Sequence, residues 1–231
     1  MTVWHLSRAI VETAWISAPT VVDAALGRVT SEACDERLDS WSRRLLEQAR
    51  IELSVHGLGH APVGETFVVM SNHQSLYDIP VVFQALERRV RMVAKSELFR
   101  VPVWAPAMRA SGFVEIDRKN RERAIESLSR AKEALASGTS IWIAPEGTRS
   151  RSGALGEFKQ GGFHLALDAD CRILPVTIVG TRKVLPAKGF NVRPGALVHV
   201  WVSEPVRAAD YGHQRRAELC EEVRRRIAEH L

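Results

Sequence analysis

Short apolar runs alternate with amphipathic helical patterns along most of the chain, and this alternation constrains the fold more than any other feature of the sequence. Apolar runs of strand length occur at residues 66–70, 90–95, 111–116, 139–144, 172–180 and 196–202. Helical patterns occur at residues 79–89, 120–138, 163–169 and 218–231. Strands that alternate with helices are typical of a layered α/β domain.

The first part of the chain is different, because it carries two successive helical patterns, at residues 3–26 and 35–53, with Pro19 as an expected kink in the first. Both patterns are amphipathic, and together they contain Trp4, Trp15 and Trp41. Such a pair either lies in a membrane interface or packs on the folded domain. The sequence of this part alone leaves both open.

The composition indicates a folded protein without a membrane-spanning segment. Hydrophobic residues make up 45% of the 231 residues and charged residues 26%, which is ordinary for a globular domain. A spanning helix needs about 20 apolar residues. The longest uncharged run near the start is only Thr13–Val22, between Glu12 and Asp23. We therefore expect neither a spanning helix nor a clear signal peptide.

The charge is unevenly distributed. The chain carries a net charge of +5, yet residues 1–57 hold six arginines against eight acidic residues. Residues 88–130 hold eleven Lys and Arg against five acidic residues. This basic zone suits an anionic partner such as phosphate, nucleic acid or acidic lipid, and a solvated helix face is the structural alternative.

Several classes of chemistry lack their signatures. Cys34, Cys171 and Cys220 are far apart and odd in number, which argues against a disulfide framework or a cysteine zinc site and for a reducing compartment. The chain has no G-x-x-x-x-G-K-[ST], G-x-G-x-x-G or H-E-x-x-H motif, and no G-x-S-x-G elbow. Nucleotide, zinc-protease and serine-hydrolase functions are therefore disfavoured.

The segment SNHQSLYDIP, residues 71–80, joins an apolar run to a helical pattern and carries His73 and Asp78. On a regular helix these side chains would lie about 140° apart. In a turn before a helix, the carboxylate can fold back onto one imidazole nitrogen and leave the other free as a base. The structural alternative is capping, with Asp78 as N-cap or paired with Ser75, and Asn72 as a turn residue. The segment alone leaves both open.

Three more segments follow or fill apolar runs. GFVEIDR ends in Arg118, which can bind a phosphate, at the strand end where open α/β sheets bind ligands. PEGTRS offers Glu146 as acceptor for a hydroxyl, Gly147 for a tight turn and Arg149 for a phosphate. The structural alternatives are a charged helix start and a turn with a salt bridge. In ILPVTIVG, Pro175 predicts an edge strand or a bulge.

In this order, NHQSLYD, GFVEIDR, PEGTRS and ILPVTIVG resemble the four sequence blocks of the glycerolipid acyltransferase family, and within it of the bacterial 1-acylglycerol-3-phosphate (lysophosphatidic acid) acyltransferases. FKQGG and AKSELFRVP also resemble the family, and the resemblance covers residues 40–205. It implies a mixed β-sheet flanked by helices and preceded by an amphipathic helical pair. We therefore expect an N-terminal helical membrane-associating element, residues 1–55, and an α/β catalytic domain, residues 56–231.

The resemblance implies acyl transfer without an acyl-enzyme. His73 would act as general base on the free hydroxyl of lysophosphatidic acid, with Asp78 orienting it. The alkoxide would attack the thioester of acyl-CoA or acyl-carrier protein and give phosphatidic acid. Ser75 is then not a nucleophile, and neither a metal nor a cofactor is implied, because the thioester is a co-substrate.

The resemblance also implies which residues bind the acceptor. The phosphate-bearing lysolipid would be held by Lys95, Arg118, Glu146, Gly147, Thr148 and Arg149. Supporting roles fall to Asn72, Gly112 and Pro175, the last at the pocket or acyl channel. The N-terminal element would contact the membrane, so we expect a peripheral or monotopic protein at the cytoplasmic face of the cell membrane. Trp104-Ala105-Pro106 departs from the glycine that relatives often have here, which leaves the acyl-chain length open.

Two alternatives remain at this point. The four blocks do not separate lysophosphatidic acid from another lysolipid acceptor, such as lyso-ornithine lipid or a lysophospholipid with a larger headgroup. A different class is a non-catalytic module that binds anionic lipid or nucleic acid through the basic zone. Nucleic acid is disfavoured as a partner, because Phe99, Trp104 and Phe113 lie within apolar runs and not among basic residues.

Overall fold

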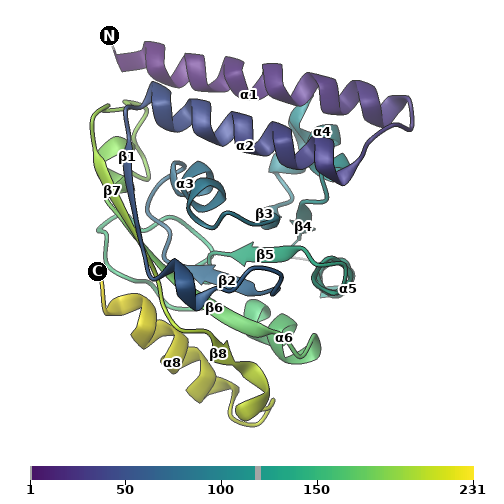
Figure 1. Cartoon of the computed structure of the whole chain (residues 1–231), viewed down its shortest axis with the longest axis vertical. Helices are drawn as coiled ribbons and strands as arrows, with labels where there is room; N and C mark the ends of the chain where they lie inside the picture. The colour runs from purple at the N-terminus through teal and green to yellow at the C-terminus, as the bar shows by residue number, and fades with distance from the viewer. Residues whose placement is uncertain (1, 118–120) are drawn as a thin grey trace.

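The computed structural model describes residues 2–117 and 121–231, and it consists of a central β-sheet between two layers of helices (Figure 1). The strands are β1 Glu52–His56, β2 Val68–Ser71, β3 Val90–Lys95, β4 Val114–Ile116, β5 Ser140–Ile143, β6 Arg172–Val179, β7 Leu197–Val202 and β8 Val206–Arg207. The helices are α1 Thr2–Ala25, α2 Ser31–Gln48, α3 Asp78–Ala85, α4 Trp104–Ala110, α5 Arg121–Ala136, α6 Gly161–Asp168, α7 Thr181–Val184 and α8 Arg216–Ala228. Short 3-10 helices are η1 Leu58–His60, η2 Leu98–Arg100 and η3 Ala208–Asp210.

The sheet is mixed, and its topology determines where a site can form. The strands follow the order β1-β7-β6-β2-β5-β3-β4, and β8 pairs with β6. β2 to β6 are parallel through their shared ladders, whereas β7 and β8 run antiparallel to β6. The carboxyl ends of five strands therefore meet at one edge, here called the carboxyl edge, where open α/β sheets bind ligands. The mixed, helix-flanked sheet expected from the sequence is confirmed.

Apolar side chains alternate onto the two faces of the sheet and build two cores. On one face the strands pack against α2 and α3, with Val81 and Val82 of α3 fully buried. On the other face they pack against α5, α6 and α8, with Phe163 and Leu219 fully buried. Each fully buried side chain of this size stabilises the fold by about 1.5–3 kcal/mol.

The N-terminal helices are attached to the sheet domain. α1 is the outermost element and lies along α2 and over α4 (Figure 1). It continues through Pro19, where a kink was expected. α2 contributes Leu45 and Leu46 to the same core as the strands. In the part of the chain that the structure describes, no helix has both the length and the apolar character needed to cross a bilayer.

The helix predicted over residues 35–53 is wrong at its carboxyl end. α2 stops at Gln48, because Arg50 adopts a left-handed conformation with φ of 47°. The amide of Ile51 then donates to Leu46 O at 2.9 Å, which is the contact of a Schellman ending. The following residues form β1, which pairs in parallel with β7. The expected domain boundary after residue 55 therefore falls inside a strand of the sheet.

Pro175 was predicted at an edge strand or bulge, and the edge prediction is wrong. β6 lies inside the sheet, between β2 on one side and β7 and β8 on the other. Its first residues pair with β8 and its last four with β7, and Pro175 lies between these two ladders. Its carbonyl accepts from Ser203 N at 3.0 Å. A residue without an N–H is tolerated where the partner strand changes.

Candidate active site

The turn after β2 brings His73 and Asp78 together. Nδ1 of His73 donates to Oδ2 of Asp78 at 2.7 Å, since a carboxylate only accepts. The same oxygen accepts the backbone amides of Gln74 and Ser75, at 2.7 and 2.8 Å. Asp78 is fully buried, while the His73 side chain is 18% exposed. The Nδ1 contact leaves Nε2 as the ring nitrogen that is not bound to the carboxylate.

The capping contacts proposed as an alternative are part of the same arrangement. The N-cap of α3 is Tyr77, whose amide donates to Oγ of Ser75 at 3.1 Å. Asp78 in turn accepts the Ser75 amide, as in a capping box. These contacts fold Asp78 back over the turn, where its carboxylate also reaches His73. The catalytic role of the pair stays a prediction, but its geometry no longer competes with capping.

Asn72 ties this turn to β6. Its Nδ2 donates to Ile178 O at 2.8 Å, and its Oδ1 accepts from Ile178 N at 2.8 Å. The side chain thus imitates a strand and extends the pairing of β2 with β6 beyond the last ladder residue. Asn72 is buried, so both groups of Ile178 depend on it for their hydrogen bonds. This contact fixes the chain immediately before His73.

Glu146 ties the same turn to the end of β5. Its Oε1 accepts from the amide of His73 at 2.8 Å, and its Oε2 accepts from the amide of Gly156 at 2.8 Å. Burial raises the pKa of Glu146, and the two amide bonds oppose that shift. Both carboxylate oxygens therefore accept hydrogen bonds from backbone amides, which gives Glu146 a positioning role. Its predicted contact with an acceptor hydroxyl stays a prediction.

A polar cleft of about 570 Å³ adjoins the turn. It is lined by the segment after Glu146, including exposed Thr148 and half-buried Arg149. Gly147 is buried in this turn with φ of 73°, and its amide donates to Ala144 O at 2.9 Å. The amide of Ser150, another lining residue, donates to His73 O at 2.7 Å. The cleft therefore adjoins the histidine turn through Ser150 and presents hydroxyl, amide and guanidinium donors.

The remaining predicted residues lie at three places. Lys95 is exposed at the carboxyl end of β3, on the same edge as His73. Arg118 lies outside the described residues. Gly112 precedes β4, at the opposite edge of the sheet, and is therefore far from the histidine turn. Pro175 pairs in register with Met70 of β2 and lies beneath the site.

Four arginines of the basic zone at residues 88–130 donate hydrogen bonds within the chain. Arg88 donates to Glu65 O, and Arg89 and Arg91 both bind the Asp35 carboxylate of α2. Arg109 donates to Phe99 O at 2.9 Å. Intramolecular acceptors already bind Arg88, Arg89 and Arg91, whereas Arg109 is 54% exposed, and an anionic partner for the rest of the zone stays a prediction.

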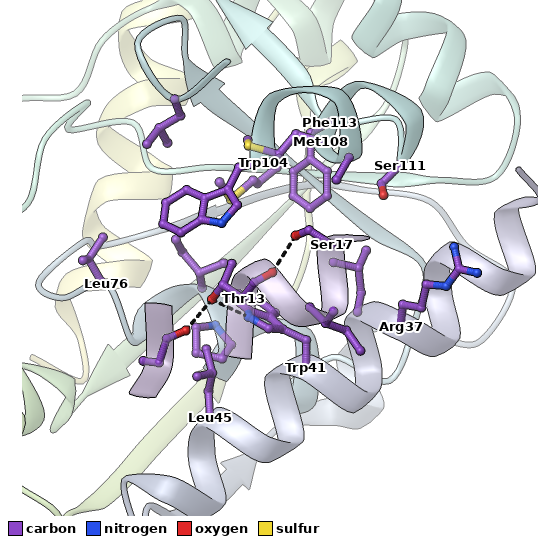
Figure 2. Close-up of a pocket in the computed structure, with 18 of the residues that line it drawn as sticks. Thr13, Ser17, Arg37, Trp41, Leu45, Leu76, Trp104, Met108, Ser111 and Phe113 are labelled. Atoms are coloured by element: carbon purple, nitrogen blue, oxygen red, sulfur yellow. Dashed lines mark hydrogen bonds between the residues drawn. The ribbon is translucent and has the colours of Figure 1, made fainter. Parts of the chain in front are cut away.

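An apolar pocket of about 250 Å³ lies on the other side of the turn (Figure 2). Leu76 and Tyr77, which follow His73 in the chain, line one end, and Arg37 and Ser111 lie at the opposite end. Burial raises the pKa of Tyr77 to about 12, so its phenol is neutral at physiological pH. The walls come from α1, α2, α3 and α4, including residues Ile10, Thr13, Ser17, Leu38, Trp41, Ile79, Trp104 and Met108.

The histidine turn therefore separates a polar cleft from an apolar pocket, an arrangement suited to an amphiphilic substrate. Among the described residues, no group of three or more His, Cys, Asp or Glu side chains is placed to hold a metal ion. A family model described as "Acyltransferase" matches residues 52–179, which is more than half of the chain. The chain belongs to the acyltransferase family.

Two relatives of this chain are both named as 1-acyl-sn-glycerol-3-phosphate acyltransferases. The chloroplastic 1-acyl-sn-glycerol-3-phosphate acyltransferase LPAT1 of Arabidopsis thaliana is 32% identical over 182 residues, covering 78% of this chain and 49% of the relative. The 1-acyl-sn-glycerol-3-phosphate acyltransferase alpha of Homo sapiens is 36% identical over 129 residues, covering 55% and 46%. The chain thus spans about half the length of these relatives.

A solved structure resembles this acyltransferase over almost its full length. The crystal structure of the 1-acyl-sn-glycerophosphate (LPA) acyltransferase PlsC from Thermotoga maritima aligns with a TM-score of 0.80 at 26% identity. The alignment covers 98% of this chain and 93% of that chain. The likeness therefore includes the N-terminal helices as well as the sheet.

Sequence reasoning missed several residues that build the site of this acyltransferase. Gly156 supplies an amide to Glu146, and a Cβ there would lie 2.9 Å from Oε2 of that carboxylate. Trp142 packs edge-on against His73, with ring centroids 6.1 Å apart, and donates to Ser71 Oγ. No spacing in the sequence indicates either contact. A glycine ten positions after a strand-end glutamate is the only signal available for the first.

We expect Asn72→Ala to destabilise the protein by about 2–5 kcal/mol, because it leaves a buried N–H and a buried C=O of Ile178 without hydrogen-bond partners. In a chain of this size the melting temperature should then fall by about 5–15 °C. The control is Asn191→Ala, which changes an exposed loop asparagine. Equal melting temperatures for the two variants would contradict the role given to Asn72.

Glu146→Gln should slow catalysis. The glutamine NH₂ group would face one of the two backbone N–H donors, so one hydrogen bond that holds the His73 turn or Gly156 would be lost. We expect kcat to fall by roughly tenfold or more, as for a small displacement of a catalytic group. Glu157→Gln, on the same segment but with its side chain 86% exposed, is the matched control. A kcat that is unchanged in Glu146→Gln would show that the carboxylate does not position His73.

Proposed function

We propose that this chain transfers an acyl group from a thioester, acyl-CoA or acyl-carrier protein, to the free hydroxyl of 1-acyl-sn-glycerol-3-phosphate and so forms phosphatidic acid. The observation that carries the proposal is the His73–Asp78 pair, with Nε2 directed away from the carboxylate and the turn placed between the polar cleft and the apolar pocket. A lysolipid needs both surroundings, one for its phosphate and one for its alkyl chain.

The chemistry needs one base and no covalent enzyme intermediate. Nε2 of His73 takes the proton of the acceptor hydroxyl as the oxygen attacks the thioester carbonyl carbon. A C–O bond forms, the C–S bond breaks, and the thiolate takes the proton back from the imidazolium. Asp78 stabilises the imidazolium and keeps the ring in the Nδ1–H tautomer. Atoms and charge balance without a metal or an added cofactor.

The acceptor assignment rests on chemistry and on relatives. The relatives described above, including the Thermotoga protein, are named for 1-acyl-sn-glycerol-3-phosphate, which is a phosphate monoester with one free hydroxyl. In this chain Arg149 and Thr148 line the cleft that adjoins the histidine turn through Ser150. We assign these residues to the phosphate, and Lys95 and Arg118 to the same role, because they follow neighbouring parallel strands.

The apolar pocket is assigned to an acyl chain. Its lining is overwhelmingly apolar, and it begins at Leu76, three residues after His73. From there it extends along α1, α2 and α4 to Arg37 and Ser111 at the other end. A chain bound there would have its carbonyl end nearest to the histidine. Pro175, on β6 beneath the turn, is not among the residues that line this pocket, so its proposed role is to shape the site from below.

We also propose that α1 lies in the membrane interface at the cytoplasmic face of the cell membrane. Val11, Trp15, Val22 and Leu26 are all more than half exposed and recur at helical spacing. Trp15 alone is 71% exposed. A contiguous exposed apolar stripe with a tryptophan suits an interfacial helix. The acyl pocket lies directly beneath α1, so a lipid would pass a short distance from bilayer to site.

His73→Ala should lower kcat for acyl transfer by about 10²–10⁴-fold, because it removes the general base. The fold should persist, since the His73 ring is part-exposed. The matched control is His213→Ala, which removes a second His–Asp pair, with Asp168, on the surface. The assay uses lysophosphatidate beside other lysolipid acceptors and both thioester donors. Full activity in a folded His73→Ala variant would overturn the mechanism, and equal use of all acceptors would overturn the acceptor assignment.

Val11→Glu combined with Trp15→Glu should weaken binding to lipid vesicles by roughly tenfold or more. Each large apolar side chain that enters the bilayer contributes about 1.5–3 kcal/mol, and 1.4 kcal/mol is tenfold. Substitution is a cleaner test than deletion, because residues of α1 also line the pocket. Ile125→Glu, at a 59% exposed position on α5 across the sheet, is the control. Vesicle binding that drops equally in the control would refute the assignment to α1.

A further inference from the structure

Arg91 is an unusual residue for its position, because it is a charged side chain in β3 that is only 5% exposed. All three of its guanidinium nitrogens are used. Nη2 donates to Asp35 Oδ1 at 2.6 Å, Nη1 donates to Val90 O at 2.9 Å, and Nε donates to Ser111 O. One buried arginine therefore joins α2, β3 and the turn between α4 and β4. The function proposed above does not use it.

These contacts lie behind one end of the apolar pocket. Ser111 lines the pocket itself, and so do Cys34 and Met92, the neighbours in sequence of Asp35 and Arg91. This is the end away from Leu76 (Figure 2). It lies near the start of β3, whereas the histidine turn lies at the carboxyl edge. Arg91 thus supports the wall that a bound chain would meet with its methyl end.

The turn that Arg91 holds is hydrogen-bonded to α4 and is continuous with residues that line the pocket. Ser111 N donates to Ala107 O at 2.8 Å, and Phe113 N donates to Met108 O at 3.0 Å, so the turn closes α4. Ala107, Met108 and Phe113 all line the pocket. Between Ser111 and Phe113, Gly112 adopts φ of 81°. A shift of the Ser111 carbonyl therefore moves three lining residues together.

Arg89 provides an internal comparison on the same strand. Its Nε donates to the other oxygen of Asp35, Oδ2, at 2.6 Å, but its side chain is one-third exposed. Its guanidinium donates to Asp35 and Glu32 of α2, and within the described residues it makes no hydrogen bond to the α4–β4 turn. Arg89 and Arg91 thus share one carboxylate and differ in the contact with Ser111. Variants of the two arginines can therefore distinguish the attachment of α2, which both support, from the support of the pocket wall, which involves only Arg91.

We propose that Arg91 is a positioning residue that sets the longest acyl chain the pocket accepts, by holding the Ser111–Phe113 turn against Asp35 at the end of the pocket away from Leu76. The inference rests on the assignment of the pocket to an acyl chain. Arg91 touches no substrate in this account and acts only through the wall. Discrimination arises because a chain that is too long must displace a turn held by a buried charged hydrogen bond.

The test compares wild type, Arg91→Met and Arg89→Met with saturated acyl-CoA and acyl-carrier-protein donors whose chains lengthen in two-carbon steps. We expect wild type to show a limiting length. In Arg91→Met the first rejected chain should gain roughly tenfold or more in kcat/KM relative to a short chain, as expected for methylenes newly admitted to an apolar pocket. Short chains do not reach the wall, so their kcat/KM should stay close to wild type. Arg89→Met should keep the wild-type profile.

A second variant keeps the proposal testable if Arg91→Met does not fold, which circular dichroism would reveal. Gly112→Ala forces a Cβ into the left-handed region beside Arg91, 3.9 Å from Nε, and should move the length limit in the same direction. An unchanged limit in the folded variants, or an equal loss at every chain length, would overturn the inference while the proposed function stands. Absence of transfer by wild type with every donor would overturn the proposed function, and the inference with it.

Discussion

The carboxylate of Asp78 is the contact on which the site depends. It is fully buried at the start of α3, and one oxygen accepts the imidazole of His73 and two backbone amides of the turn. Desolvating a carboxylate is unfavourable by several kcal/mol. Three short hydrogen bonds and the amino end of a helix offset that term. Its other oxygen, Oδ1, is buried with no hydrogen-bond partner within the described residues. Such a carboxylate holds the turn in one conformation.

Two further side chains fix the same turn from neighbouring strands. Asn72 binds the backbone of Ile178 at the end of β6, and Glu146 binds the amide of His73 from the end of β5. Because β6, β2 and β5 are adjacent and parallel, three strand ends supply one rigid support. Catalytic groups gain most from such preorganisation when their supports are themselves buried and hydrogen-bonded. Helices α1 and α2 then cover one face of the sheet domain with apolar side chains.

The sequence predicted the parts of the structure that local patterns determine. Apolar runs that alternate with helical patterns predicted a layered α/β domain, the family resemblance implied the mixed sheet, and a turn before a helix was expected to bring Asp78 to His73. The sequence-based prediction was wrong where contacts between distant segments determine the local structure. The helix predicted over residues 35–53 included Glu52 and Leu53, the first residues of β1, whose strand conformation comes from pairing with β7. The arginines of the basic zone resembled ligands for an anion, yet Arg91 is satisfied by Asp35, fifty-six positions earlier. The pocket residues come from four helices and from segments between them, so no single segment indicates them.

The most direct test of the account is a double-mutant cycle on the catalytic pair. The kcat/KM for acyl transfer to lysophosphatidate would be measured for His73→Ala, for Asp78→Asn and for the double variant, each checked for folding. Residues that act as one unit show strongly non-additive losses. The account predicts that the double variant is no slower than His73→Ala alone. Losses that multiply in the double variant would show that Asp78 acts independently of His73, and would contradict it.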